Sequence, residues 1–208
     1  VRILSEVTAI STSDKSVTVQ NLVDGTSYTE HYDKLILSPG ASPILPKSIL
    51  GIQRPHVFTV RNVRDIRMLK NYIDSHKIEQ AAVIGGGFIG VEVAENLALA
   101  GISVSLVEGA PQIMAPFDYD VVQTLHKEMM DNGISLYLSS TLTEVQEDRI
   151  LIRSKEKTQE IKADLVVMAI GVRPETALAS AAGLTIGTTG GIWVNHNYQT
   201  SDPDIYAV

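Results

Sequence analysis

The stretch from Ala81 to Glu92 reads AAVIGGGFIGVE and carries the strongest structural signal in the chain. Its apolar opening predicts a short buried strand, and the three glycines that follow predict a tight turn. Apolar residues then recur at helical spacing as far as Leu97, and Gly101 stands where such a helix ends. We therefore expect a strand, a glycine turn and a helix, which together form the first half of a βαβ unit.

The glycines of this stretch match the pattern G-x-G-x-x-G at Gly85, Gly87 and Gly90. In that pattern the first glycine allows the tight turn, the second lets a pyrophosphate approach the backbone, and the third lets the helix press against the strand. The helix N-terminus adds free N–H groups and a partial positive charge. The pattern alone is weak evidence for a dinucleotide site, so the neighbouring sequence must show whether such a site is present.

A second predicted strand, residues 102–107, follows and ends at Glu108. This acid lies about 20 residues beyond Gly87, where a ribose-binding carboxylate is expected. A carboxylate accepts hydrogen bonds from the ribose hydroxyls and repels a 2′-phosphate, and Gly109 and Ala110 supply no cation to offset that repulsion. The sequence therefore favours NADH over NADPH. The alternative is an ordinary α/β turn with Glu108 as a solvated acid.

The composition excludes several classes of protein. The chain has 208 residues, enough for one large or two small domains, and a net charge of −7, which argues against nucleic acid and anionic membranes as partners. Its apolar runs are too short to cross a bilayer. It has no cysteine, which rules out disulfides and cysteine catalysis within this chain and fits a cytoplasmic location. Both ends lie inside patterned segments, so we expect a piece of a longer protein.

The N-terminal part of the chain is rich in strand signals. Residues 1–30 predict an antiparallel meander, with a first strand at 1–4 and a hairpin turn at Asp24-Gly25. Residues 34–37 predict a short buried strand. Prolines and glycines then mark 39–55 as a linker and as the clearest domain boundary.

The remaining segments predict alternating helices and strands. Asn62 can cap a helix that ends near Ser75, and Asp118 can cap another over residues 119–131. Three short alternating runs between 142 and 162 predict a second meander, and the apolar run 165–170 is typical of a central parallel strand. We further expect a turn at 171–174, a short helix at 175–182, and one strand ahead of the terminal apolar run in 192–208.

Four motifs, in order and covering nearly the whole chain, resemble those of the FAD-dependent pyridine nucleotide-disulfide oxidoreductases. The similarity is greatest to the branch that contains coenzyme A-disulfide reductase, NADH oxidase and NADH peroxidase. The motifs are YDKLILSPGASP at 32–43, the glycine stretch through Glu95, AIGVRP at 169–174 and TSDPDIYAV at 200–208.

This resemblance implies an α/β fold, with a Rossmann-like parallel sheet, helices and an antiparallel β-meander in three layers. It places residues 1–40 and 172–208 in partial FAD-domain segments, and 41–171, with a linker at 41–56, in an NAD-binding domain. The parent would be a homodimeric flavoenzyme that passes hydride from NADH to FAD and on to a disulfide, peroxide, polysulfide or oxygen. The family's FAD-binding glycine motif, redox cysteine and dimerisation domain are not in this chain, so the resemblance implies an inactive fragment.

The resemblance also implies roles for individual residues. Gly87 and Ile89 would give backbone contacts to the NAD phosphates, and Phe88 would be an aromatic gate over the flavin. Glu92, one turn further along the helix, would point towards the flavin. The alternatives are a ring packed on the sheet edge for Phe88 and a solvated acid for Glu92.

Other residues have two open interpretations each. Phe117 would lie near the adenosine, or act as a hydrophobic staple ahead of the helix that Asp118 caps. Gly171 would present a bare backbone edge to the cofactor, or serve only as a turn glycine. By the same resemblance four residues would contact FAD in the parent, although Val7 also suits a core strand and Arg61 a surface position: Val7, Ser38, Pro39 and Arg61.

Two further functions stay open at this point. The parent could reduce a small electron-transfer protein of the rubredoxin or ferredoxin type, or the chain could be a stand-alone NAD-binding module. The histidines show no metal-ligand spacing, and we interpret all of them as structural or surface residues: His31, His56, His76, His126 and His196.

Overall fold

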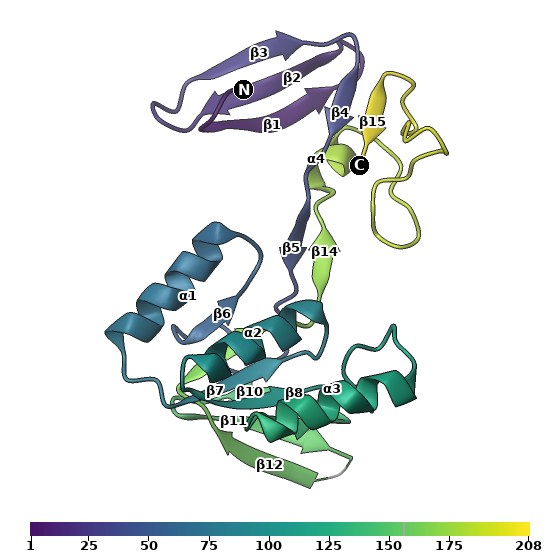
Figure 1. Ribbon diagram of the computed structural model, residues 1–208. Helices are drawn as coiled ribbons and strands as arrows, with labels where there is room; N and C mark the ends of the chain where they lie inside the picture. The colour runs from purple at the N-terminus through teal and green to yellow at the C-terminus, as the bar shows by residue number, and fades with distance from the viewer. Residues whose placement is uncertain (156) are drawn as a thin grey trace. The chain divides into compact units, whose positions relative to one another are not determined.

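The computed structural model describes residues 1–155 and 157–208 and divides into two compact units. One unit consists of residues 43–172, and the other combines 1–42 with 173–208. The first contains the glycine stretch and all three long helices, and the second contains the N-terminal strands and the C-terminal segment (Figure 1).

The unit formed by residues 43–172 is built on a parallel sheet of five strands in the order β6-β13-β7-β8-β9. Strands that are adjacent in the sheet pair in parallel throughout. The strands are β6 (Val57–Thr59), β13 (Leu165–Met168), β7 (Gln80–Ile84), β8 (Ser103–Val107) and β9 (Ser135–Tyr137).

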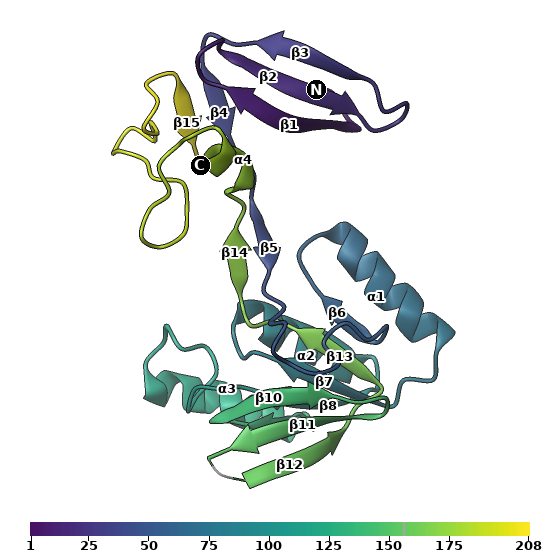
Figure 2. The ribbon, with the colours of Figure 1, turned by 180° about the vertical axis from the view of Figure 1, so that it is seen from behind.

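Each face of this sheet has its own covering layer, because successive side chains of a strand point to opposite faces. On one face Ala81 and Val83 pack in a core with the helices α1 (Val63–Ser75), α2 (Phe88–Leu99) and α3 (Tyr119–Asp131). On the other face Ala82 and Ile84 pack against an antiparallel meander. The meander consists of β10 (Ser140–Val145), β11 (Arg149–Ser154) and β12 (Lys157–Lys162), and Figure 2 shows it in front of the sheet.

The position of β13 inside the sheet explains why its sequence is a continuous apolar run. Leu165 and Val167 belong to the helix-side core, and Val166 and Met168 belong to the meander-side core. Both neighbours of β13 are also strands, so all four of its residues are buried. The predicted three-layer α/β fold, with its parallel sheet and meander, is confirmed.

The second unit has three small groups of strands and one short helix. The strands β1 (Ser5–Ser11), β2 (Ser16–Asn21) and β3 (Ser27–His31) form the expected meander. The strand β4 (Leu35–Leu37) pairs in parallel with β15 (Ile205–Ala207), and α4 (Ala177–Ala181) packs beside them through Ala179. The Asp204 carboxylate joins both ends of this unit by bridging Lys15 and Lys34.

Three predictions for this unit were wrong. Residues 1–4 are not a strand, since Leu4 has a φ of 53° and only Ser5 begins β1. The strand predicted at 34–37 is not fully buried, because the Ile36 side chain is 67% exposed. Residues 192–204 hold no strand, since loop hydrogen bonds such as that from the Asn195 N–H to the Gln199 carbonyl replace a ladder.

The segment predicted as a turn at 171–174 instead contains the strand β14 (Val172–Pro174). The residues after it are held by a distant part of the chain, because the N–H of Glu175 donates to the carbonyl of Gly40. The strand β5 (Ala41–Pro43) likewise interrupts the predicted linker. Neither extended segment has a local signal, since each depends on a partner more than a hundred residues away in the sequence.

Within the described residues no helix is both long enough and apolar enough to cross a membrane. The longest helices, α1 and α3, have 13 residues each, whereas a membrane-spanning helix needs about 20.

The first turn of α1 provides a test of its capping. The Asn62 side chain accepts hydrogen bonds from the N–H groups of Arg64 and Asp65, and the Asp65 carboxylate accepts one from the N–H of Asn62. We expect Asn62→Ala to destabilise this turn by about 1 kcal/mol. Amide hydrogen exchange at Arg64 and Asp65 should then accelerate roughly fivefold. Asn71→Ala, in the exposed interior of the same helix, is the control and should leave the first turn protected.

Candidate functional site

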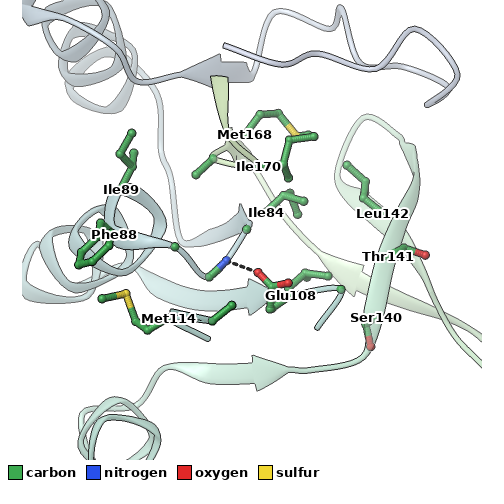
Figure 3. Close-up of a pocket in the computed structure, with 18 of the residues that line it drawn as sticks. Ile84, Phe88, Ile89, Glu108, Met114, Ser140, Thr141, Leu142, Met168 and Ile170 are labelled. Atoms are coloured by element: carbon green, nitrogen blue, oxygen red, sulfur yellow. Dashed lines mark hydrogen bonds between the residues drawn. The ribbon is translucent and has the colours of Figure 1, made fainter. Parts of the chain in front are cut away.

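A cavity of about 650 Å³ opens at the carboxyl ends of the central strands, within the unit formed by residues 43–172. Figure 3 shows Phe88 and Ile89 from the start of α2 on one side of it, and Ser140, Thr141 and Leu142 from β10 on the other. The ends of β7, β8 and β13 form its floor. Ligands bind in open α/β sheets at this edge of the sheet.

Backbone geometry explains the glycines that shape the cavity. Gly85 has a φ of 108°, which side-chain-bearing residues rarely adopt, and a Cβ placed on it would lie 2.4 Å from the carbonyl oxygen of Ala169. A Cβ on Gly90 would lie 1.8 Å from the carbonyl oxygen of Gly85. Both glycines therefore allow the turn and the helix to lie close to β7 and β13.

Gly87 differs from these two glycines. Its φ is −80°, and a Cβ placed on it would meet no described atom within 4 Å. The position is therefore open on its cavity side. The first hydrogen bond at the start of α2 runs from the N–H of Val91 to the carbonyl of Gly87, so the earlier amides of the turn have no partner inside the helix. An anion in the cavity would face these N–H groups and the positive end of the helix dipole.

The Glu108 carboxylate lies at the end of β8 and holds two backbone segments together. One of its oxygens accepts a hydrogen bond from the N–H of Gly86 at 2.6 Å (Figure 3). The other accepts one from the N–H of Ala110 at 2.7 Å. The side chain is partly buried and lines the cavity. A carboxylate has about four acceptor positions, so it can accept further hydrogen bonds from a ligand.

The loop 109–117 forms one wall of the cavity through Met114, Ala115 and Pro116. The N–H of Met114 donates to the carbonyl of Gly86 at 2.7 Å, which fastens the loop to the glycine turn. At the end of the loop the ring of Phe117 meets the ring of Phe88 edge to face, with 6.0 Å between their centroids.

Most of the sequence-predicted nucleotide residues come together around this cavity. Six of them line it: Gly85, Gly87, Phe88, Ile89, Glu108 and Gly171. Gly90 is buried directly behind the turn, and Phe117 reaches the site only through its contact with Phe88. Glu92 is exposed on α2 and does not line the cavity.

The residues predicted to contact FAD are distributed differently. Val7, Ser38 and Pro39 line a separate cavity of about 840 Å³, which lies within the unit that contains both chain ends. Arg61 belongs to the other unit, where it stands exposed just before α1 and its N–H donates to the Asp65 carboxylate.

Sequence reasoning missed the wall that β10 supplies. Ser140, Thr141 and Leu142 line the cavity because the N–H of Ser140 donates to the carbonyl of Glu108 at 2.9 Å. The alternating pattern predicted a strand in this region but not which of its ends would reach the site. One signal was available, since small polar residues follow directly after β9 at the same edge of the sheet.

The histidines fall into two groups. His31, His76 and His196 are exposed, whereas His56 and His126 are buried and burial lowers the pKa of both. The described residues contain no cluster of three or more side chains able to hold a metal ion.

A parallel sheet, a glycine turn that opens a helix and a carboxylate at the end of the next strand define a Rossmann-like α/β protein of the dinucleotide-binding class. The chain belongs to the pyridine nucleotide-disulphide oxidoreductase family, whose pattern matches residues 1–208. The resemblance inferred from the sequence motifs is thus confirmed.

Two curated relatives are similar over nearly the whole chain. An NADH oxidase from Methanocaldococcus jannaschii is 37% identical over 99% of this chain and 46% of its own length. A coenzyme A disulfide reductase from Staphylococcus haemolyticus is 31% identical over 100% of this chain and 46% of its own length. The chain therefore spans about half the length of these relatives.

Two solved structures share the fold. Reduced CoADR-RHD from Bacillus anthracis superposes with a TM-score of 0.94 at 45% identity, and the match covers 100% of this chain and 37% of that one. A water-forming NADH oxidase from Lactobacillus brevis, solved with NADH bound, gives a TM-score of 0.86 at 30% identity over 98% of this chain and 44% of its own.

The contrast between Gly85 and Gly87 predicts opposite effects on stability. Gly85→Ala forces a side chain into a left-handed conformation and against the carbonyl of Ala169, so we expect it to lower the free energy of unfolding by at least about 2 kcal/mol. Gly87→Ala places its methyl group in open space and should change stability by less than about 0.5 kcal/mol. Urea unfolding of both variants measures this difference, and equal stabilities would contradict the assigned turn geometry.

Proposed function

We propose that residues 43–172 bind NADH in the cavity at the carboxyl edge of the sheet. The main observation in support is the position of Glu108, whose carboxylate lines the cavity beside the glycine turn and the start of α2. The pyrophosphate would lie against Gly87 and the free amides of the turn, and the adenosine ribose would donate to Glu108. These residues fit the cofactor, since Gly87 leaves space and the first turn of α2 carries no acidic side chain.

The charge of the cavity supports NADH over NADPH. Glu108 is the one charged side chain among the described residues that line it. A 2′-phosphate placed beside the ribose would therefore meet a negative carboxylate with no neighbouring lysine or arginine to offset it. A ribose with free hydroxyls instead gains charge-assisted hydrogen bonds, which are stronger than those between neutral groups.

The chain would be the NADH-binding portion of a flavoprotein oxidoreductase. Family membership supports this proposal, as do the names of the relatives. In the whole protein, proposed to be a homodimer, FAD would supply the redox chemistry that links NADH oxidation to reduction of a disulfide, peroxide, polysulfide or oxygen. Val7, Ser38 and Pro39 would contact FAD from the unit that holds both chain ends. The proposed FAD contact of Arg61 rests on the family resemblance.

The domain assignment is part of the same proposal. Residues 1–40 and 172–208 would belong to the FAD-binding part, and 41–171 to the NAD-binding part. The compact units change at 42/43 and 172/173, within two residues of these limits. Each crossing lies inside a short extended segment, β5 or β14, which suits a passage between domains.

Two residues on α2 would act at the nicotinamide end. Phe88 is 60% exposed at the cavity mouth, and its ring packs edge to face on the ring of Phe117. An exposed ring of this kind could change rotamer and act as a gate. Glu92 lies one turn along α2 with an exposed side chain, free to meet a partner from another part of the whole protein.

Replacement of Glu108 tests the proposal. Glu108→Gln keeps the side-chain shape but removes the charge and one of the two oxygens that accept from Gly86 and Ala110, so we expect it to weaken NADH binding by about 1–3 kcal/mol and to narrow the difference in affinity between NADH and NADPH. Calorimetric titration with each cofactor measures both effects. Glu95→Gln, an exposed acid on α2 that does not line the cavity, is the matched control and should bind both cofactors as the unchanged chain does.

If Glu108→Gln binds NADH as tightly as the unchanged chain does, the assignment of Glu108 to the NADH site is wrong. Tighter binding of NADPH than of NADH by the unchanged chain would overturn the proposed preference. Failure of a folded chain to bind either cofactor would count against this cavity as a self-sufficient nucleotide site.

A further inference from the structure

His126 is a buried histidine that connects a helix to the wall of the cavity. It lies on α3 with 5% of its surface exposed, and its Nε2 accepts a hydrogen bond from the N–H of Ile113 at 3.3 Å. Ile113 itself is completely buried in the helix-side core. Because Nε2 accepts, the ring proton must be on Nδ1, and the imidazole must be neutral. The loop 109–117 is thus fastened to α3 through one uncharged ring.

Ile113, the residue to which His126 is hydrogen-bonded, is in direct contact with the glycine turn. The Ile113 side chain lies so close to Gly86 that a Cβ there would be 2.5 Å from its Cγ2 atom. The next residue, Met114, donates its N–H to the carbonyl of Gly86, and the N–H of Gly86 donates to Glu108. A continuous series of contacts therefore runs from α3 through the loop to the carboxylate proposed to bind the ribose.

We propose that His126 is a positioning residue that holds the loop 109–117 against Gly86, so that NADH affinity depends on a neutral imidazole. The proposal rests on the NADH-binding function argued above. Protonation puts an N–H on Nε2, which then faces the N–H of Ile113 with no acceptor between them. The loop loses this hydrogen bond to α3 and is held there by the packing of Ile113 alone, so the cavity wall formed by Met114 and Pro116 is less firmly fixed beside Glu108.

The surroundings of His126 favour the neutral form. Burial lowers the pKa of its imidazole, and no neighbouring charge is strong enough to oppose that effect. Glu108 on the loop side is already engaged by two backbone N–H groups. The charged groups of α2, α3 and the end of the loop are exposed: Glu92, Glu95, Asp118, Asp120, Lys127, Glu128 and Asp131.

The sign of the pH dependence follows from this lowered pKa. In the unfolded chain the histidine titrates near pH 6.5, and in the folded chain it titrates at lower pH. The stabilising contact is complete above the unfolded pKa and is lost as the pH falls through the folded pKa. NADH affinity should therefore be constant at and above neutral pH. Below the folded pKa it should fall with a slope of at most about tenfold per pH unit, since one proton is involved.

Two substitutions at the same position separate positioning from packing. His126→Gln can place an uncharged amide oxygen near Nε2, so we expect NADH affinity within about threefold of the unchanged chain at pH 7.5 and no pH dependence between pH 5 and 8. His126→Leu fills the space without an acceptor and should bind about tenfold more weakly at every pH. His76→Gln, at an exposed histidine in the same unit, is the control and should retain the pH dependence.

A second measurement needs no cofactor. Amide hydrogen exchange at Ile113 and Met114, corrected for the intrinsic effect of pH, reports the attachment of the loop directly. We expect protection in the unchanged chain at pH 7.5, loss of it at low pH, loss at all pH values in His126→Leu, and pH-independent protection in His126→Gln. Leu106, in the centre of β8, supplies the reference amide that shows the unit is still folded.

The outcomes separate this proposal from the function on which it rests. If His126→Gln keeps the pH dependence of the unchanged chain, or if Ile113 stays protected at low pH and in His126→Leu, the positioning role is wrong. If exchange follows the expected pattern but NADH binds to no variant at any pH, the loop attachment stands and the NADH-binding function falls.

Discussion

The hydrogen bonds of the Glu108 carboxylate are the interaction on which the rest of the site depends. Glu108 accepts from Gly86 in the glycine turn and from Ala110 at the start of the next loop, so a single side chain holds the turn and the loop that line the cavity. An acid at this position is therefore structural, in addition to the selective role proposed for it. Since its carboxylate retains acceptor capacity, it can hold the backbone and recognise a ribose at the same time.

This arrangement is possible only because the sheet is covered on both faces. The helices seal one face and the meander seals the other, so the strand ends are the free edge at which backbone N–H groups and Glu108 are accessible. The glycines have different structural roles at that edge. Gly85 and Gly90 bring backbones together, whereas Gly87 leaves room for a ligand. A cavity with one negative side chain and a helix N-terminus suits a ligand that has both phosphates and hydroxyls.

Local signals in the sequence predicted an element well where the residues that stabilise it lie within the element or next to it. The cap at Asn62, the helix over 119–131 and the continuous apolar strand β13 were all predicted because capping, helical periodicity and burial act within a few residues. The cap predicted at Asp118 was wrong, since its side chain makes no hydrogen bond to the first turn of α3. Predictions failed where the cause is distant. The strand β14 needs residues near Gly40, and Ile36 stays exposed on a strand that is covered only in part.

The sequence by itself determined the glycine turn and the acid at the end of β8, since periodicity and spacing along the chain record them directly. It also determined the fold class and the family, through the resemblance of four motifs to a known family. Only the tertiary structure decided which side chains share the cavity. Ser140 and Thr141 reach it because the chain returns from β9 at the same edge, and Phe117 reaches Phe88 across the loop. The contact between His126 and Ile113 likewise joins a helix to a loop through folding alone, and no spacing along the chain encodes it.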